Sequence, residues 1–172
     1  MQKTPAILGI DTGTRRCGVG FLDANSGNYV LATSVDLVST RKGFDRAILA
    51  AIHTHDLLEV AMGTQALSGY YIHAIGIELP WIGKNSQSSL VLAMAAGAII
   101  GMLYPICSNV VGVQPAQAKA AIDGPRASKE TIHRILSLEY GLSTATYDMT
   151  DALAVARYVR NLYLEEKMSH GN

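Results

Sequence analysis

The chain has 172 residues, of which 49% are hydrophobic and 16% charged, and its formal net charge is zero. This balance predicts one compact domain over residues 1–172 and excludes a disordered chain. Two cysteines, Cys17 and Cys107, lack metal-ligand spacing and indicate buried, reduced thiols in a cytoplasmic protein. Zero net charge argues against a nucleic-acid partner, unless several acids cluster around metal and leave the remaining surface basic.

Short apolar runs separated by turn residues predict an antiparallel meander at the start of the chain. Its three strands are expected at residues 6–10, 18–22 and 29–37. A helix is predicted next at residues 42–62, with Ser39 or Thr40 as its N-cap and Gly63 at its end. The apolar run at residues 72–78 predicts the fourth strand.

The second half of the chain is predicted to consist of four helices and one strand. The helices are expected at residues 86–103, 114–122, 128–141 and 148–167, and the strand at 108–113. The apolar part of the first of these helices spans only about 15 residues, short of the roughly 20 needed to cross a bilayer. The order predicts an α/β fold with a mixed sheet, an antiparallel meander followed by parallel strands, and helices on both faces.

Four acids stand where this fold would bring them together. Asp11 ends the first strand and Glu78 ends the fourth, while Asp148 and Asp151 share one face at the start of the last helix. Acids at the ends of buried strands repel each other unless a cation compensates them. Oxygen ligands of this kind suit hard divalent ions such as Mg²⁺, and two such ions can promote phosphodiester cleavage.

Each acid also has an ordinary structural interpretation. Asp11 could shape a turn through its side chain, and Glu78 could face solvent at a strand end. Asp148 could be the N-cap of the last helix, with Asp151 at its third position as in a capping box. The metal-site interpretation depends on all four acids together and on the apolar residues that flank the first two.

Three motifs resemble the RuvC family of Holliday junction resolvases. Ile7-Leu-Gly-Ile-Asp-Thr-Gly-Thr-Arg-Arg-Cys-Gly-Val-Gly-Phe21 resembles the family's opening, Ile77-Glu78 its second acid, and Asp148-Met-Thr-Asp-Ala-Leu-Ala-Val-Ala156 its closing helix. The order of the acids and the total length agree as well. Thr12 stands where the bacterial enzymes usually have proline, a departure that points to a divergent, phage-type branch acting on a wider range of branched DNA.

The resemblance implies a ribonuclease H-like fold and an endonuclease that makes paired nicks in four-way or branched DNA. It implies a homodimer and two Mg²⁺ or Mn²⁺ ions per site, held by Asp11, Glu78, Asp148 and Asp151. Such an enzyme would be cytoplasmic, or lie in the host cytoplasm if its source is viral.

The resemblance also suggests which residues contact the substrate. Lys119 matches a family lysine and is expected to act in catalysis and on phosphate. Trp81 matches an aromatic residue expected to stack at the junction centre. Lys129 matches a second family lysine, with one residue fewer between the two in this chain, and is likewise expected to act on phosphate. The remaining candidates for DNA contacts are Arg15, Arg16, Lys84 and Arg126. For each, an ordinary solvated or partly buried side chain is the alternative.

One further pattern concerns assembly. Ala93, Gly97 and Gly101 are spaced by four residues, so one face of their helix is nearly free of side chains. Such a face allows close approach either to the same helix in a second copy or to this chain's own sheet.

Other functions start from the same residues. Asp11-Thr-Gly-Thr14 also resembles a phosphate loop of actin-like ATPases and sugar kinases, but 172 residues leave no room for their second lobe. Cleavage of RNA–DNA hybrids uses a similar acid set and stays open as an alternative. A degenerate protein that binds branched DNA without cutting it is the non-enzymatic alternative.

Overall fold

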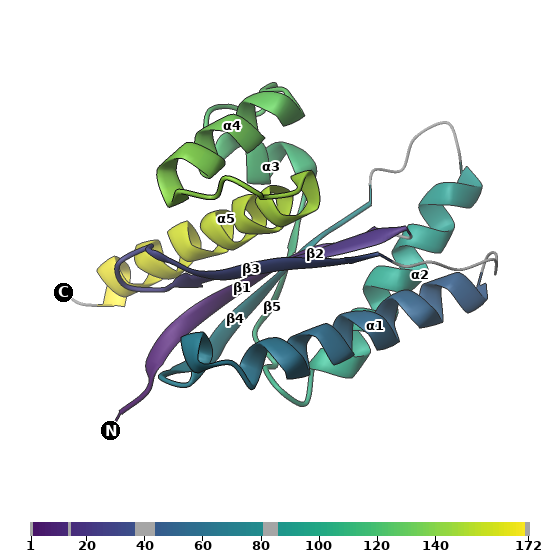
Figure 1. The fold of residues 1–172 in the computed structure, drawn as a ribbon, viewed down its shortest axis with the longest axis horizontal. Helices are drawn as coiled ribbons and strands as arrows, with labels where there is room; N and C mark the ends of the chain where they lie inside the picture. Colours follow the sequence, from purple (N-terminus) through teal and green to yellow (C-terminus); the bar gives the residue numbers. More distant parts are fainter. Residues whose placement is uncertain (1, 14, 37–43, 81–85, 171–172) are drawn as a thin grey trace.

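The computed structural model describes residues 2–13, 15–36, 44–80 and 86–170. Within them lies one five-stranded mixed sheet with helices on both sides (Figure 1), which confirms the predicted fold class. The strands are β1 (Thr4–Asp11), β2 (Arg16–Asp23), β3 (Tyr29–Asp36), β4 (Tyr70–Glu78) and β5 (Val110–Val113). The helices are α1 (Phe44–Met62), α2 (Ser86–Leu103), α3 (Pro115–Ala120), α4 (Lys129–Tyr140) and α5 (Tyr147–His170).

The strands are arranged in the order β3-β2-β1-β4-β5. β1 pairs antiparallel with β2, and β2 with β3, so the first three strands form the predicted meander. β4 pairs parallel with β1, and β5 parallel with β4. Because β1 and β4 are parallel neighbours with Ile10 opposite Ile77, both strands end at the same edge of the sheet.

Two apolar clusters hold the helices to the sheet. α1 and α2 cover one face, where Phe21, Ile75, Ile99 and other residues form the first cluster. α3, α4 and α5 lie on the opposite face (Figure 1), where Leu136, Leu153 and Val155 belong to the second cluster. The strands of the sheet are almost continuously apolar because side chains on both of its faces are covered.

Helix α5 lies unusually close to the central strands, because glycines remove the side chains that would hold it away. A Cβ on Gly18 of β2 would lie 2.1 Å from the carbonyl oxygen of Asp148. A Cβ on Gly9 of β1 would lie 2.0 Å from the carbonyl oxygen of Ala152. The glycine-rich strands thus bring the first turns of α5 against β1 and β2.

Most predicted element bounds hold to within two or three residues, and two details differ. A short 3₁₀ helix at Gln65–Leu67 was not predicted, and α3 is shorter than the expected 114–122. Ser128 accepts a hydrogen bond from the Thr131 amide and Gly141 ends α4 with φ 66°, as the sequence predicts. The expected caps of the first helix, Ser39 and Thr40, lie outside the described residues. Cys17 and Cys107 are buried and unpaired, as predicted.

In the described part of the chain, no helix, α2 included, is both long enough and apolar enough to span a bilayer.

Candidate functional site

Asp11 and Glu78 stand side by side at the edge where β1 and β4 end. Their neighbours Ile10 and Ile77 are paired across the two parallel strands. The Thr12 hydroxyl donates a hydrogen bond of 2.9 Å to the carbonyl oxygen of Glu78, which ties the loop after β1 to the end of β4. Thr12 is the residue that departs from the family's usual proline, and its hydroxyl supplies a contact that proline has no group to make.

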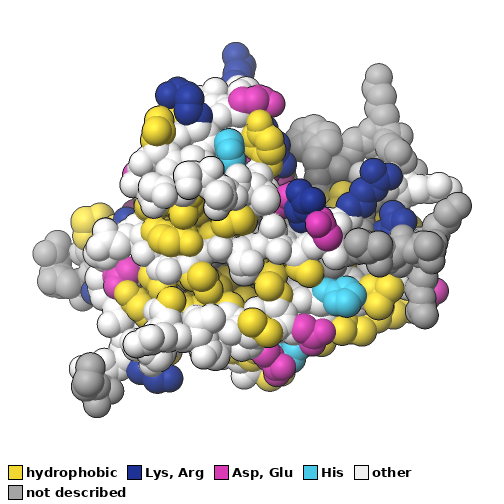
Figure 2. Space-filling view, viewed as in Figure 1, with side chains coloured by type: hydrophobic (Ala, Val, Ile, Leu, Met, Phe, Trp, Pro, Cys, Tyr) yellow, Lys and Arg dark blue, Asp and Glu magenta, His cyan; other side chains and the backbone are white. Residues whose placement is uncertain are grey.

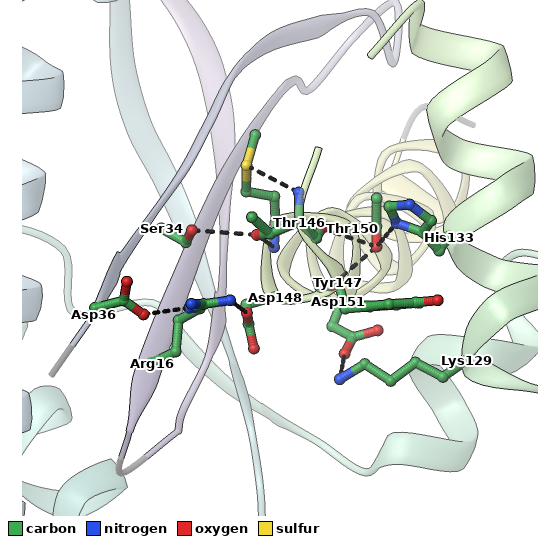
Figure 3. Close-up of polar contacts among 11 residues, drawn as sticks. Arg16, Ser34, Asp36, Lys129, His133, Thr146, Tyr147, Asp148, Thr150 and Asp151 are labelled. Carbon is green, nitrogen blue, oxygen red and sulfur yellow. Dashed lines mark hydrogen bonds and ion pairs between the residues drawn. The ribbon is translucent and has the colours of Figure 1, made fainter. Parts of the chain in front are cut away.

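Asp148 and Asp151 reach the same edge from the first turns of α5. The amide of Met149 donates to the Thr146 hydroxyl at 3.3 Å, so Thr146, and not Asp148, provides the side-chain cap. The capping interpretation of Asp148 is therefore wrong. Its carboxylate instead faces β2, where an Arg16 guanidinium nitrogen, Nη1, lies 3.5 Å from its Oδ2 (Figure 3).

A pocket of about 200 Å³ opens beside these acids. Its charged lining consists of two acids, Glu78 and Asp151, and two lysines, Lys119 and Lys129. Apolar side chains from α3, α4 and α5 complete the wall. Acidic and basic side chains also lie next to each other at this end of the molecule in Figure 2. The structure therefore brings both family lysines to the acid site.

Burial and mutual repulsion shape the electrostatics of the site. Burial raises the pKa of Asp11 well above its ordinary value, and the charge of Glu78 raises it further. Burial also raises the pKa of Glu78 to about 7, with a second contribution from Asp151. The pKa of Asp151 is raised by burial, while Lys129 lowers it. The negative charge of Asp148 also acts on Asp11, so all four predicted acids share one electrostatic environment.

Two of the acids are paired with basic side chains. Lys129 Nζ lies 2.5 Å from Asp151 Oδ2, and Arg16 lies beside Asp148 (Figure 3). In the described part of the chain, no three Asp, Glu, His or Cys side chains stand close enough to hold one metal ion. The acids thus surround one site without converging on a single point, and metal binding would require their side chains to rearrange.

The donor set nevertheless fits a hard divalent cation. All four predicted ligands are carboxylates, which Mg²⁺ and Mn²⁺ prefer over softer metals. The raised pKa values of Asp11 and Glu78 come from burial and like charge, and a bound cation would relieve both. Lys129 already places one positive charge among the acids.

The other predicted contact residues fall into three groups. Arg15 and Arg126 are exposed on turns. Arg16 contacts two carboxylates, one of them Asp148. Trp81 and Lys84 lie outside the described residues. For all five residues, a role in DNA binding stays a prediction.

The sequence reasoning missed two aromatic side chains at the site. The rings of His133 on α4 and Tyr147 on α5 have centroids 4.5 Å apart, and His133 Nδ1 lies 3.2 Å from the Thr150 hydroxyl. Lys129 Nζ lies 5.8 Å from the centre of the Tyr147 ring. Two features of the sequence could have placed these residues at the site: His133 lies one helical turn after Lys129, and Tyr147 directly precedes Asp148.

The raised pKa of Glu78 predicts an unusual pH dependence of stability without metal. The folded protein binds this proton more tightly than the unfolded chain, whose glutamate titrates near 4.5. Protonated Glu78 therefore makes its full contribution to the free energy of unfolding below pH 4.5, and this contribution is lost as the pH rises through about 7. Urea unfolding in EDTA should show that the free energy of unfolding falls more between pH 5 and pH 8 for the native chain than for Glu78→Gln. Equal decreases in both proteins would contradict the raised pKa of Glu78.

The five-stranded mixed sheet, antiparallel and then parallel with helices on both faces, has the ribonuclease H-like fold, and four acids lie at the ends of its central strands and the start of α5. The family model for "Crossover junction endodeoxyribonuclease RuvC" matches residues 7–158. This chain belongs to the RuvC family.

Similar proteins agree with that assignment. The RuvC of Helicobacter pylori (strain Shi470) is 30% identical over 155 residues, covering 87% of this chain and 92% of that protein. The RuvC of Mycolicibacterium vanbaalenii is 31% identical over 156 residues, covering 87% and 76% of the two chains. A solved structure of T. thermophilus RuvC with a Holliday junction substrate superposes with a TM-score of 0.69 at 17% identity, covering 92% of this chain and 95% of that one. At that identity, the last comparison supports the fold alone.

Proposed function

We propose that this protein resolves Holliday junctions and other branched DNA by paired phosphodiester nicks. One observation carries the proposal: in a chain of the RuvC family, four carboxylates share one electrostatic environment at the edge of the sheet, and two of them, Glu78 and Asp151, line a pocket together with two lysines. The relatives from Helicobacter and Mycolicibacterium are named crossover junction endodeoxyribonucleases, and the T. thermophilus relative was solved with a Holliday junction.

The four acids would hold the divalent ions, for which we propose two Mg²⁺ or Mn²⁺ per site. When bound, such ions supply Lewis-acid polarisation of the phosphate that is cut. The ligands would be Asp11, Glu78, Asp148 and Asp151. The first two are fixed by the strand ends, and the other two by the first turns of α5.

The two lysines would act on the DNA phosphate. Lys119 and Lys129 line the same pocket as Glu78 and Asp151, so a phosphate held there would meet both positive charges. Lys129 would exchange its contact with Asp151 for one with the phosphate when divalent ions occupy the acids. Arg15, Lys84 and Arg126 are proposed as further phosphate contacts, and Trp81 as a side chain that stacks on a base.

A nicking panel tests the proposed function. The substrates are a synthetic four-way junction, a linear duplex of the same sequence and an RNA–DNA hybrid, each with Mg²⁺, with Mn²⁺ and with EDTA. We expect paired nicks in the junction with either metal and none with EDTA. Preferred cutting of the hybrid would replace the proposal by ribonuclease H activity. Tight junction binding without any cutting would identify a protein that only binds DNA.

We also propose that two copies of the chain form the active enzyme. The outer side of the α1–α2 layer is apolar: Phe44, Ile48 and Ile52 are exposed at helical spacing on α1. On α2, Leu90 is 60% exposed, and a Cβ on Gly97 or Gly101 would meet nothing within 4 Å. The alternative in which the glycine face packs on this chain's own sheet is therefore wrong. A second copy would cover the exposed apolar side of both helices. The dimer would then have two acid sites, one for each of the two strands that are nicked in a junction.

Leu90→Arg is expected to convert the dimer to monomers, because it places a charge in the apolar interface. Sedimentation at micromolar concentration should show a dimer for the native chain and a monomer for the variant. Leu138→Arg is the matched control, since Leu138 is also exposed, at 73%, but lies on α4. A native monomer, or a dimer unaffected by Leu90→Arg, would contradict the proposed interface.

The proposed organisation is one nuclease domain, because all five described strands belong to one sheet that α1 to α5 enclose. A DNA substrate would place the enzyme in the cytoplasm, or in the host cytoplasm if the source is viral.

A further inference from the structure

Arg16 lies between two carboxylates at the edge of the acid site. It begins β2 and is paired with Asp36 of β3 in the antiparallel register. Its Nε is 2.5 Å from Asp36 Oδ1, and its Nη1 is 3.5 Å from Asp148 Oδ2 (Figure 3). A guanidinium group carries five donors in a planar fork and can hold two carboxylates at once.

The backbone around Asp148 is held on the same side. Gly18 leaves just enough room for the Asp148 carbonyl against β2. Ser34 of β3, the residue paired with Gly18, hydrogen-bonds Thr146, the residue that caps α5, at 3.2 Å. With the backbone fixed by these contacts, the direction of the Asp148 carboxylate depends on its side-chain rotamer, and Arg16 contacts that carboxylate directly.

We propose that Arg16, held in place by Asp36, is a positioning residue that orients the Asp148 carboxylate for metal binding. The inference rests on the proposed nuclease function. Carboxylates that bind metals are commonly oriented by hydrogen bonds from outside the ligand set. The charge of Arg16 is already matched by Asp36 and Asp148, so little of it is left to attract a phosphate.

The alternative is that Arg16 contacts DNA phosphate, and the two roles predict opposite effects. A positioning residue changes the cutting rate and leaves junction affinity unchanged. A phosphate contact changes affinity and its salt dependence. Asp36→Asn separates the two most clearly, because freeing Arg16 from Asp36 would improve a phosphate contact but weaken the positioning of Asp148.

Thermal unfolding in EDTA tests whether the contact exists in solution. Arg16→Met should lower the Tm by about 1–3 °C in the native background, as expected for a partly exposed ion pair in a chain of this size. The same substitution should have a smaller effect in the Asp148→Asn background, where only the pair with Asp36 is left to lose. Equal shifts in both backgrounds would overturn the inference.

Single-turnover cutting of a four-way junction tests the role itself, with junction affinity measured separately in EDTA. Arg16→Met should cut about 10–100-fold more slowly, with affinity unchanged within about twofold. Asp36→Asn should be slower in the native background and have no further effect in Arg16→Met, because Asp36 acts through Arg16. Arg16→Lys should restore only part of the rate, since one ammonium group cannot reproduce the guanidinium fork.

Arg134→Met serves as the matched control, because Arg134 is exposed on α4. Weaker junction binding by Arg16→Met, together with tighter binding by Asp36→Asn, would establish a phosphate contact and overturn the inference. Normal cutting by Arg16→Met would overturn it as well. A native protein that cuts no junction would instead contradict the proposed function.

Discussion

Asp11→Asn is expected to abolish DNA cleavage and, at the same time, to stabilise the metal-free protein. The carboxylate is buried beside Glu78, and both burial and the neighbouring charge raise its pKa. An uncharged amide removes this desolvation cost and repulsion, so the Tm in EDTA should rise by a few degrees. Loss of a metal ligand removes several kcal/mol of transition-state stabilisation, which lowers the cutting rate by about 10³-fold or more.

Three measurements on this variant check the metal assignment. Junction binding should be retained, because the substitution removes no positive charge. Mg²⁺ should raise the Tm of the native chain but not that of the variant. Asp123→Asn, at an exposed position in the turn after α3, is the control and should change neither rate nor stability. Cutting by Asp11→Asn at the native rate would refute the role of Asp11, and a lower Tm in EDTA would refute the electrostatic argument.

Gly18→Ala is expected to destabilise the fold strongly and to displace the start of α5. Its Cβ would lie 2.1 Å from the carbonyl oxygen of Asp148 and 2.5 Å from the carbonyl carbon, far inside normal contact distances. Both atoms are backbone, so the helix itself must move. We expect a loss of about 3 kcal/mol in the free energy of unfolding. For a chain of this length, this corresponds to a Tm lower by roughly 6–12 °C.

The displaced helix should also impair cutting at temperatures where the variant is folded, because Asp148 and Asp151 move with α5. Gly69→Ala is the matched control: nothing lies within 4 Å of a Cβ at that position. It should leave the stability unchanged or slightly raised. If Gly18→Ala unfolds like the control, α5 does not approach β2 as closely as the structure has it.

Much of the fold could be predicted because its signals are local. Apolar runs of five and seven residues that lead to Asp11 and Glu78 indicated buried strands, and Ser128 and Gly141 marked the ends of α4 through their own backbone preferences. The 3₁₀ helix at Gln65–Leu67 was missed because three residues are too few to establish a period.

The acid site was predictable as a set of residues but not as a geometry. Acids on the ends of β1 and β4 must be neighbours once those strands pair in parallel. The partners of Asp148 and Asp151 could not be inferred in the same way. Arg16 lies 132 positions before Asp148, and its contact depends on how closely α5 approaches β2.

The amino-acid sequence alone thus determined the order of the elements and the family, and predicted the four acids as the metal site, because each depends on short motifs and hydrophobic periodicity. Only the tertiary structure decided that Thr146 caps α5, that Lys129 pairs with Asp151, and that the glycine face of α2 is exposed. These features depend on distances between segments far apart in the chain, which are set by the packing of helices on the sheet.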